Sequence, residues 1–596
     1  MGRSARISAP SPLAVALSIA VAMAVLSGCR SDDPMRTYAP GAALDGPRQR
    51  GGHIVLVREE DPDFLDPALS YGVYTYPMDA AVFHTLLSYA DEPGPAGARV
   101  VPELVESLPE VREGGTLYCM KVRHDARFGA PLHRHITAED WRYSIQRLFR
   151  VNCPGVTFYH HIVGAEDVMH GRDTSLSGVI ARGDSLYIRL THPDPIFKFL
   201  LAMPFMSPIP AEVDRRWPNA YSQHTVSTGP YEFAEFVPRR HAILVRNPDY
   251  FGTPAWIDTI EIRFNVPSNT AVTMIRRGLI DGGFFEVPAA DFARLRIDSL
   301  WKRQIDLADG LNTEYLWMNM REKPWTDPRV RQAVAWALDR RAILKMWSGK
   351  GEVAGEFLPP GMPGARRLGR YAGPDTARAR QLLREAGYPN GFSTTLYGWM
   401  FEPSPRELTL IQQQLAAVGI RARLDVGETT GYTSMAGDTT RHIPFGIYSW
   451  YADYVDPSNF FDTLLNGHRI EPRHNQNLGL FDDPGVNAAI EHAMTIADDS
   501  TRARAYTAID ERVMDLAPVV PTLHILDSRL YSPRLGGWYR HITHILNLED
   551  LYVKPPRGDH EPPAVARRLA QSDKRDVAQS GRRDAGSGKR DVMERF

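Results

Sequence analysis

The sequence predicts a mixed α/β protein of two or three domains. Its 596 residues are 43% hydrophobic and 23% charged, an ordinary globular composition that can bury several cores rather than one. Short β-type runs, such as His53 to Val57 and Ile260 to Phe264, are mixed with helices that have clear start signals. The body of the chain is therefore expected to combine helices and strands.

The clearest predicted helix begins at Thr326-Asp327-Pro328. A capping side chain there can accept hydrogen bonds from the first backbone amides, and Pro328 occupies a position whose N–H is not needed. A second helix is predicted to follow Asp375 and to stop at Gly387. Both helices are interpreted as packing elements because their apolar residues recur at helical spacing: Val330, Val334, Ala337 and Leu338 in the first, and Ala379, Leu382, Leu383 and Ala386 in the second.

The N-terminal segment predicts secretion and a lipid anchor. Arg3 and Arg6 precede an apolar run from Leu13 to Leu26, which is too short to span a bilayer comfortably. The run ends in Leu26-Ser27-Gly28-Cys29, which resembles a bacterial lipobox, and a cysteine thiolate can take a lipid through a thioether. Cys29 is therefore the predicted lipidation site and mature N-terminus, and the alternative is an ordinary signal peptide with an incidental cysteine.

The two remaining cysteines and the net charge give further information about the kind of protein. Cys119 and Cys153 are an even pair in an oxidising compartment, so they form either a disulfide or two free buried thiols. Lys and Arg total 69 against 71 Asp and Glu, so there is no basic excess for nucleic-acid binding. No later stretch approaches about 18 consecutive apolar residues, so the anchor is expected to be a tether.

Several segments, taken in order, resemble the large extracellular solute-binding proteins of peptide and nickel importers, the family 5 binding proteins. The resemblance covers roughly residues 51 to 556 and rests on the order of the segments rather than on any single one. They include Gly51-Gly52-His53-Ile54-Val55, Val101-Pro102-Glu103-Leu104, Thr137-Ala138-Glu139-Asp140, Ser227-Thr228-Gly229-Pro230-Tyr231, Arg246-Asn247-Pro248-Asp249-Tyr250, Glu385-Ala386-Gly387-Tyr388-Pro389 and Trp450-Tyr451-Ala452-Asp453-Tyr454.

The resemblance implies a periplasmic-binding-protein-like α/β fold with two large hinged lobes and a smaller inserted lobe. It implies no enzymatic activity, and motifs typical of enzymes are absent from the sequence. The expected division is a signal peptide at 1–28, a lipid-anchored linker at 29–50, a discontinuous first lobe at 51–73, 218–310 and 520–556, an inserted lobe at 74–217, a third lobe at 311–519, and a disordered charged tail at 557–596.

The resemblance also implies a ligand site. A peptide's α-ammonium must be paired when lobes close around it, because desolvating it alone is costly. In peptide-binding relatives this role belongs to the Asp of a Trp-x-Ala-Asp-Tyr segment, here Asp453, with Trp450 beside it. Tyr71 is the expected contact from the first lobe, and Trp399 the expected wall of a side-chain pocket. Each of these residues has an ordinary alternative: a solvated or capping Asp, or a packed aromatic ring.

One departure from the family bears on the solute. Oligopeptide receptors of the family place an Arg three residues before the Trp of that segment, where it helps to hold a peptide carboxylate, and here the position is Ile447. The loss of that cation weakens the expected carboxylate contact and favours a non-peptide solute. The first hypothesis is nevertheless a peptide receptor that serves an ABC importer permease as a monomer. The alternatives are a receptor for a nickel complex or a sugar on the same scaffold, and a cell-surface interaction or chaperone-like protein.

Neither a cofactor nor a metal site is expected. His133-Arg134-His135 and His160-His161 have no Cys or carboxylate at ligand spacing. The acidic run from Glu59 to Asp66 lacks the spaced oxygens and the Gly of a calcium loop, and it is interpreted as a solvated strand end.

Overall fold

The computed structural model describes residues 48–72, 75–371, 373–400, 403–539, 541–543 and 546–554. All of them belong to one compact unit, Ala39–Phe596. The N-terminal apolar run, Cys29 and the charged tail from residue 557 lie outside the described residues, and so do the predictions made for them. None of the helices in the described ranges combines the length and apolar character that a bilayer crossing requires.

A five-stranded sheet holds the first predicted strand, β1, between two parallel neighbours. Strand β1 (His53–Arg58) pairs in parallel with β10 (Thr259–Arg263) and with β11 (Gly282–Phe284). Strands β9 (His241–Arg246) and β8 (Tyr231–Val237) continue the sheet beyond β10 in antiparallel pairing. Both strands predicted from the sequence are confirmed to within one residue at each end.

This sheet has its own apolar core. Ile54 and Leu56 of β1 are fully buried, as are Ile260 and Ile262 of β10, which is the alternation expected of a strand with one face in the core. The helices in this part of the chain are α2 (Tyr76–Val82), α7 (Ser268–Arg276) and α8 (Ala289–Leu295), and a two-stranded sheet of β19 (Leu535–Gly536) and β20 (Tyr552–Val553) accompanies them.

Residues 110–189 form a four-stranded antiparallel sheet in the order β4-β5-β7-β6. Helix α3 (Ala138–Arg150) packs on β6 and β7. The strands are β4 (Glu110–Arg112), β5 (Leu117–Lys121), β6 (Val179–Arg182) and β7 (Ser185–Arg189). Nearby elements are β2 (Leu87–Tyr89), β3 (Val100–Pro102), α4 (Ala165–Met169), α5 (Phe197–Leu200) and α6 (Ala211–Arg216).

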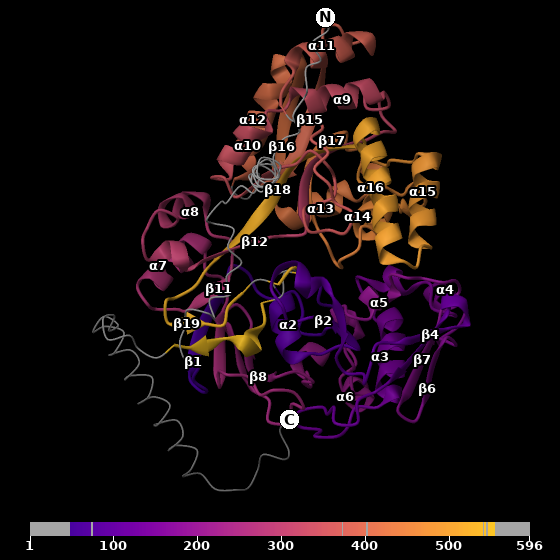
Figure 1. The fold of residues 1–596 in the computed structure, drawn as a ribbon, viewed down its shortest axis with the longest axis vertical. Coiled ribbons are helices and arrows are strands. Elements are labelled where there is room, and N and C mark those ends of the chain that lie inside the picture. Colours follow the sequence, from indigo (N-terminus) through magenta and orange to yellow (C-terminus); the bar gives the residue numbers. More distant parts are fainter. Residues whose placement is uncertain are drawn as a thin grey trace, which may run out of the picture. The chain divides into compact units, whose positions relative to one another are not determined.

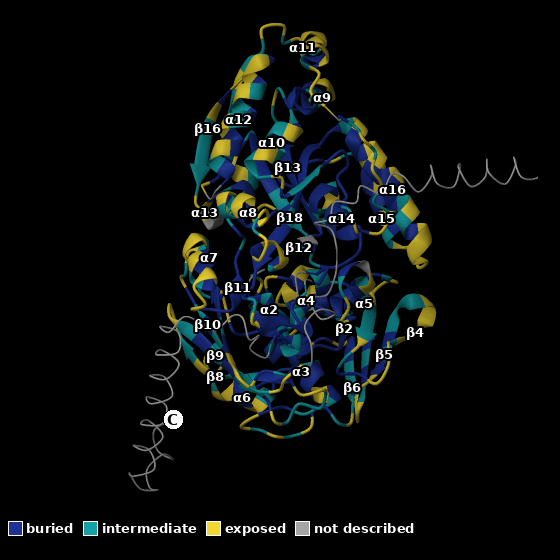
Figure 2. Cartoon of the chain, turned by 60° about the vertical axis from the view of Figure 1, so that its left-hand side comes forward, coloured by how far each residue is buried: buried dark blue, intermediate teal, exposed yellow. Residues whose placement is uncertain are grey.

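A seven-stranded sheet in the order β12-β18-β13-β17-β15-β16, with β14 paired to β18, dominates residues 305–530. Strand β13 is buried along its whole length (Figure 2). The strands are β12 (Ile305–Asp309), β13 (Asn312–Met318), β14 (Gly351–Val353), β15 (Phe392–Trp399), β16 (Ile420–Gly427), β17 (Phe445–Tyr451) and β18 (Val519–Leu530). The helices are α9 (Pro328–Ala337), α10 (Arg340–Met346), α11 (Thr376–Glu385), α12 (Ser404–Ala417), α13 (Thr429–Ala436), α14 (Ser458–Leu465), α15 (Pro484–Met494) and α16 (Asp499–Leu516).

Two predicted helix starts are confirmed by their capping contacts, and a third helix has a similar cap. The Asp327 side chain accepts a hydrogen bond from the backbone of Arg329 at the start of α9, over 2.9 Å. Asp375 accepts one from the backbone of Arg378 in α11, over 2.8 Å. At α3, the Asp140 carboxylate accepts the backbone N–H of the capping Thr137 over 2.9 Å, as in a capping box.

Two paired strands lead from the seven-stranded sheet towards the five-stranded one. Strands β12 and β18 are antiparallel, with Ile305 opposite Leu530. Just beyond β18, the Ser532 amide donates to the Asp281 carbonyl, beside β11, over 2.7 Å. Figure 1 shows β12 and β18 side by side at one edge of the seven-stranded sheet. The residue boundaries of the three lobes stay a prediction.

Cys119 and Cys153 are both free thiols in this structure. Cys119 lies half-buried on β5, while Cys153 is buried after α3. Burial raises the pKa of the Cys153 thiol to about 12. Of the two alternatives that the sequence leaves open, the structure therefore has the two thiols, although only Cys153 is fully buried.

Two carboxyl groups face each other inside the core of the seven-stranded sheet. Glu314 of β13 and Glu407 of α12 are both buried and hydrogen-bonded to each other. Thr522 donates to Glu314 over 2.8 Å, and the Trp347 indole donates to Glu407 over 3.1 Å. Burial raises the pKa of both carboxyls, and the charge of Glu314 raises that of Glu407 further. The pair is therefore expected to hold a proton at neutral pH.

Because of the Glu314–Glu407 pair, we expect the free energy of unfolding to depend on pH. A carboxyl with a raised folded-state pKa contributes stability that is complete below its unfolded pKa, about 4.3, and is lost as the pH rises. Glu407→Gln keeps the shape and cannot ionise, so we expect it to be more stable than wild type at pH 8 by about 1–2 kcal/mol. The difference should shrink towards pH 5 in urea unfolding. Glu385→Gln, at an exposed position of α11, is the control, and parallel pH profiles for Glu407→Gln and wild type would contradict the interpretation.

Candidate functional site

Tyr71 and Asp453, two of the four predicted ligand residues, meet in the structure. The Tyr71 hydroxyl donates to Asp453 Oδ1 over 2.7 Å. Tyr71 lies in the loop between β1 and α2, and Asp453 follows β17, so the contact joins segments 382 residues apart. Tyr71 is 44% exposed. Its ring is therefore accessible from solvent while its hydroxyl touches the carboxylate.

A buried asparagine that sequence reasoning missed organises the other side of Asp453. The Asn459 side-chain amide donates to Asp453 Oδ2 over 3.0 Å, and its oxygen accepts the backbone N–H of Asp453 over 3.0 Å. The same oxygen accepts the Trp450 indole N–H over 2.9 Å. Asn459 is fully buried near the start of α14. No local sequence pattern indicates this role of Asn459, because the contact depends on the turn that brings the start of α14 close to the end of β17.

Trp450 and Trp399 are largely buried rather than lining an open surface. Trp450 is 9% exposed and Trp399 is 6% exposed. The Trp399 ring packs against Tyr448 at a centroid distance of 5.5 Å and against Tyr432, nearly perpendicular, at 5.6 Å. Asp453 contributes to the raised pKa of Tyr448, after burial. Trp399 thus belongs to an aromatic cluster near the carboxylate, and direct ligand contact stays a prediction for both tryptophans.

The Asp453 carboxylate is held without a basic partner. Burial raises its pKa, while the hydrogen bonds from Asn459 and Tyr71 lower it, and the net pKa is raised. In the described part of the chain, Asp453 forms no ion pair with Lys, Arg or His. The pKa of Tyr71 is raised by burial first and by the Asp453 charge second, so the phenol stays protonated and donates. The arrangement is one half-buried carboxylate whose two oxygens are oriented by two neutral groups.

Ile447 does not face this carboxylate. It is fully buried on β17, and a β-carbon added at Gly398 would lie 2.9 Å from it and 2.6 Å from Leu408 of α12. Tyr448 and Trp450, at the alternate positions of the strand, are on the other face, where Trp399 and Asn459 lie. The sequence departure at position 447 is therefore explained here by core packing, and this position is not aimed at Asp453.

The loop that carries Tyr71 is fixed by two acidic residues. Asp63 Oδ2 accepts the backbone N–H groups of Tyr71 and Gly72 over 2.7 and 2.9 Å. Asp66 is buried and accepts both terminal nitrogens of Arg147, over 3.0 and 2.5 Å. The interpretation of this acidic run as a solvated strand end is therefore wrong for Asp66, because a buried guanidinium compensates its charge.

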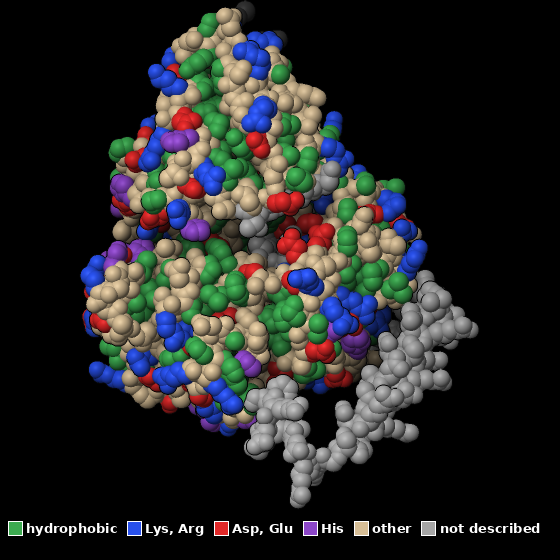
Figure 3. Space-filling model, turned by 180° about the vertical axis from the view of Figure 1, so that it is seen from behind, with side chains coloured by type: hydrophobic (Ala, Val, Ile, Leu, Met, Phe, Trp, Pro, Cys, Tyr) green, Lys and Arg blue, Asp and Glu red, His purple; other side chains and the backbone are tan. Residues whose placement is uncertain are grey.

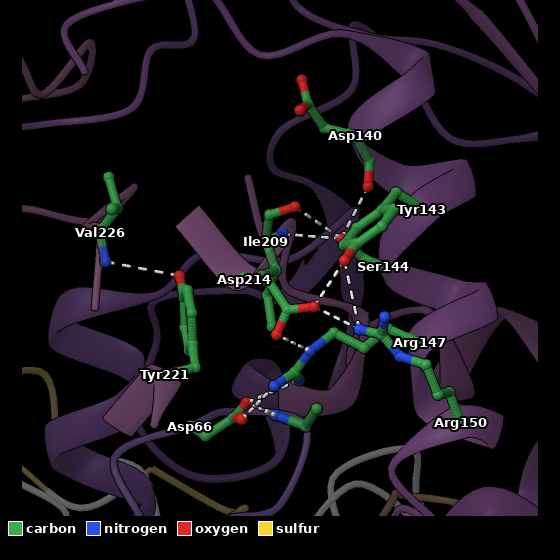
Figure 4. A network of polar contacts seen from close by, with 11 residues as sticks. Asp66, Asp140, Tyr143, Ser144, Arg147, Arg150, Ile209, Asp214, Tyr221 and Val226 are labelled. Carbon is green, nitrogen blue, oxygen red and sulfur yellow. Dashed lines mark hydrogen bonds and ion pairs between the residues drawn. The ribbon is translucent and has the colours of Figure 1, made fainter. Parts of the chain in front are cut away.

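Arg147 connects this loop to the inserted segment (Figure 4). Its Nε donates to Asp214 Oδ1 over 2.8 Å, and its side chain, like those of Asp66 and Asp214, is at most 3% exposed. Arg150 and Tyr143 also contact Asp214. The network is built from α3 and α6, so these helices help to set the position of Tyr71.

The histidine pairs found in the sequence have separate polar contacts. His133 Nδ1 lies 2.6 Å from Asp249, and the rings of His160 and His161 lie 3.8 Å apart. Burial lowers the pKa of His160 to about 4, and the charge of His161 lowers it further. Across the described ranges, no group of three or more His, Cys, Asp or Glu side chains is arranged to hold a metal ion.

Known proteins resemble this chain over most of its length. The heme-binding protein A of Haemophilus influenzae is 26% identical over 88% of this chain and 96% of its own length. The di/tripeptide-binding protein 2 of Pseudomonas aeruginosa is 29% identical over 81% of this chain and 92% of its own. These relatives are binding proteins rather than enzymes.

Several solved structures have folds similar to that of this chain. The clavulanic acid biosynthesis oligopeptide binding protein 2 superposes with a TM-score of 0.80, at 25% identity, over 86% of this chain and 97% of its own. A periplasmic binding protein of Helicobacter pylori, associated with an ABC transporter and in complex with the peptide STSA, gives 0.73 at 23% identity, over 85% of this chain and 99% of its own. The periplasmic-binding-protein-like α/β fold is thereby confirmed.

A family model also matches the sequence directly. Residues 99–471 fit the model described as "Bacterial extracellular solute-binding proteins, family 5 Middle". That match spans more than half of the 596 residues. The chain belongs to the bacterial extracellular solute-binding proteins of family 5, and it is an extracytoplasmic solute-binding protein rather than an enzyme.

Proposed function

We propose that this protein captures a peptide between two hinged lobes and delivers it to an ABC importer, as a monomer tethered to the membrane by a lipid on Cys29. The peptide's α-ammonium pairs with Asp453. Support comes from relatives whose names state peptide binding, including the di/tripeptide-binding protein of Pseudomonas aeruginosa and the Helicobacter pylori protein in complex with the peptide STSA. The observation that carries the proposal is the desolvated Asp453 carboxylate, oriented by Tyr71 and Asn459.

The carboxylate suits an ammonium group for a physical reason. An ionised carboxylate offers about four acceptor positions, of which Tyr71 and Asn459 use two. An ammonium group brings three donors and the opposite charge, so it can satisfy the remaining positions and offset the cost of desolvation. A neutral solute satisfies the hydrogen bonds but leaves the charge unpaired.

The same contact suggests how binding is linked to closure. Tyr71 and Asp453 come from segments near different sheets, and β12 and β18 are the paired strands between those sheets. A solute that touches both sides favours the closed arrangement only through contacts that are absent when the sides separate. The Tyr71–Asp453 hydrogen bond is one such contact, and a bound ammonium adds more.

The test compares peptides that differ only at the amino end. Ligand carried through purification is identified by mass spectrometry, and thermal unfolding is then measured with free and N-acetylated tripeptides. At a concentration 100 times Kd, a free-amine peptide is expected to stabilise the protein by about 2.7 kcal/mol. Acetylation removes the charge and should abolish most of this gain. Equal stabilisation by both forms, or a purified ligand without an amine, would refute the ammonium pairing.

Heme is the second candidate solute, because the Haemophilus influenzae heme-binding protein matches 88% of this chain. Heme carries carboxylates and no ammonium, so Asp453 offers it no charge complement. Addition of heme, followed by its visible absorption band, separates the two: a saturable band shift that free peptides do not displace would favour heme.

A further inference from the structure

A cavity with a volume of about 260 Å³ lies near the Asp453 site. One face of α2 forms a wall, and the β2–β3 region and His541, Asn547 and Glu549 form the others. Four of its lining residues are acidic: Asp79, Asp91, Glu103 and Glu549. Figure 3 shows acidic side chains gathered around a hollow on one face of the molecule.

Two tyrosines of the cavity lining also lie near Asp453. Tyr76 and Tyr89 both line it. The pKa of each is raised by burial first, and the charge of Asp453 contributes to both shifts. The Tyr89 hydroxyl also accepts the backbone N–H of Val455 over 3.3 Å, two residues beyond Asp453. The acidic cavity and the candidate ammonium site are therefore neighbours that share an aromatic wall.

The cavity has little positive charge to balance its carboxylates. Among the described lining residues there is no Lys or Arg. The Nδ1 atom of His84 lies 3.2 Å from the Glu103 carboxylate. His541 uses both ring nitrogens elsewhere, on the Ala90 carbonyl at 2.9 Å and on Thr543 at 2.8 Å. Among the described lining residues, one histidine, His84, lies within ion-pair distance of any of the four carboxylates.

The side chain of Asp79 provides an independent observation, because one of its oxygens is a buried acceptor without a hydrogen-bond partner among the described residues. It is only 2% exposed, and its Oδ2 accepts the Ser70 hydroxyl over 2.6 Å. Its Oδ1 is buried without a hydrogen-bond partner among the described residues. Burial raises its pKa strongly, although the nearby Arg58 charge acts in the opposite sense. A buried acceptor left unpaired is costly, and a donor entering the cavity can remove that cost.

The other carboxyl groups are fixed in place around the cavity. Glu103 Oε2 accepts the Thr85 backbone N–H over 3.0 Å. Asp91 is contacted by Tyr539 and Asn547 and shares a hydrogen bond with Asp550. Burial raises the pKa of Glu549 to about 8, and the charges of Asp550, Asp91 and Glu103 add to the shift. Glu549 is therefore expected to hold a proton at pH 7 that a cation can displace.

We propose that this acidic cavity receives a second cationic group of the solute, so that the protein selects peptides with a Lys or Arg side chain near the amino end. The inference rests on the proposed peptide capture at Asp453 and adds the side-chain class. An ammonium at Asp453 and a basic side chain reaching past Tyr76 place one positive charge on each side of the shared aromatic wall. Cation binding in the cavity then pairs the carboxylates and satisfies the Asp79 acceptor.

The test uses two tripeptides, Lys-Ala-Ala and norleucine-Ala-Ala, which differ by a charge at nearly constant shape. Wild-type protein is expected to bind the lysine peptide at least about tenfold more tightly by calorimetry. Glu549→Gln and Asp79→Asn should reduce this preference and leave norleucine-Ala-Ala binding within about twofold. Glu139→Gln, an exposed carboxylate on α3, is the matched control and should keep the full preference.

A second readout follows the displaced proton. Calorimetry in buffers of different ionisation enthalpy at pH 7 should show proton release with the lysine peptide, because Glu549 is mostly protonated there. Norleucine-Ala-Ala should release none, and Glu549→Gln should reduce the release. This readout separates an ionic role of Glu549 from a merely structural one.

The outcomes distinguish this inference from the proposed function. If both peptides bind equally and both are lost in Asp453→Asn, peptide capture stands and the cationic selectivity is wrong. If neither peptide binds, peptide capture itself fails, and the selectivity fails with it. If the lysine preference survives in Glu549→Gln and in Asp79→Asn, the acidic cavity is not its source.

Discussion

Replacing Arg147 by Leu is expected to destabilise the protein by about 3–5 kcal/mol. The guanidinium makes three hydrogen bonds, two to Asp66 and one to Asp214, and all three side chains are at most 3% exposed. Leucine fills the space but leaves buried negative charge without its partner, which is the costly way to break an ion pair. Asp214 keeps Arg150 and Tyr143, so the larger loss falls on Asp66.

The matched control lies on the same helix. Arg142 of α3 pairs with Glu139, but its side chain is 40% exposed, so Arg142→Leu should change the free energy of unfolding by no more than about 1 kcal/mol. Urea unfolding of the two variants and wild type measures both values. If Arg147→Leu costs no more than Arg142→Leu, the network is not a stabilising element.

Arg147→Leu should also lower the affinity of the candidate site for peptide. Asp66 belongs to the loop in which Asp63 holds the backbone of Tyr71. Losing the Arg147 contacts frees one end of that loop, so peptide affinity should fall even where the protein remains folded. A variant that is destabilised but binds peptide as wild type does would show that Asp63 alone positions Tyr71.

Local chemistry made part of the fold predictable. The starts of α9 and α11 follow from Asp327 and Asp375, because a capping side chain acts on amides two or three residues away. Strands β1 and β10 follow from short apolar runs in the same way. These features depend on near neighbours in the chain, so the sequence contains what is needed to infer them.

The candidate site was predictable only through resemblance, and only in part. Tyr71 and Asp453 were named separately, but nothing in the sequence indicates that a hydrogen bond joins them across 382 residues. Asn459 and the pairing of Asp66 with Arg147 were missed for the same reason. The sequence indicates a lost ligand contact at Ile447, whereas the alternation of β17 puts this side chain in the core. Which face a residue occupies, and what lies across it, is decided by tertiary packing.

Asp453→Asn is expected to weaken binding of a free-amine tripeptide by about 30-fold to several thousand-fold, the range that follows from losing a buried charge pair of 2–5 kcal/mol. The amide has nearly the shape of the carboxylate, so Tyr71 and Asn459 keep a neighbour at 453. What disappears is the negative charge. Because burial raises the pKa of the Asp453 carboxyl, removing that charge should leave stability unchanged or slightly increased.

A double-mutant cycle, in which wild type and Asp453→Asn are each tested with the free and the N-acetylated peptide, isolates the charge–charge contribution to binding. An acetylated tripeptide has no ammonium to lose, so its weak binding should be nearly the same in wild type and in Asp453→Asn. Asp425→Asn, on the edge strand β16 with a side chain 43% exposed, should bind both peptides as wild type does. If Asp453→Asn weakens free and acetylated peptides by the same factor, residue 453 shapes the site without pairing the ammonium. The positive end of the solute would then have to be neutralised by another carboxylate, and the acidic cavity lined by Tyr76 offers several.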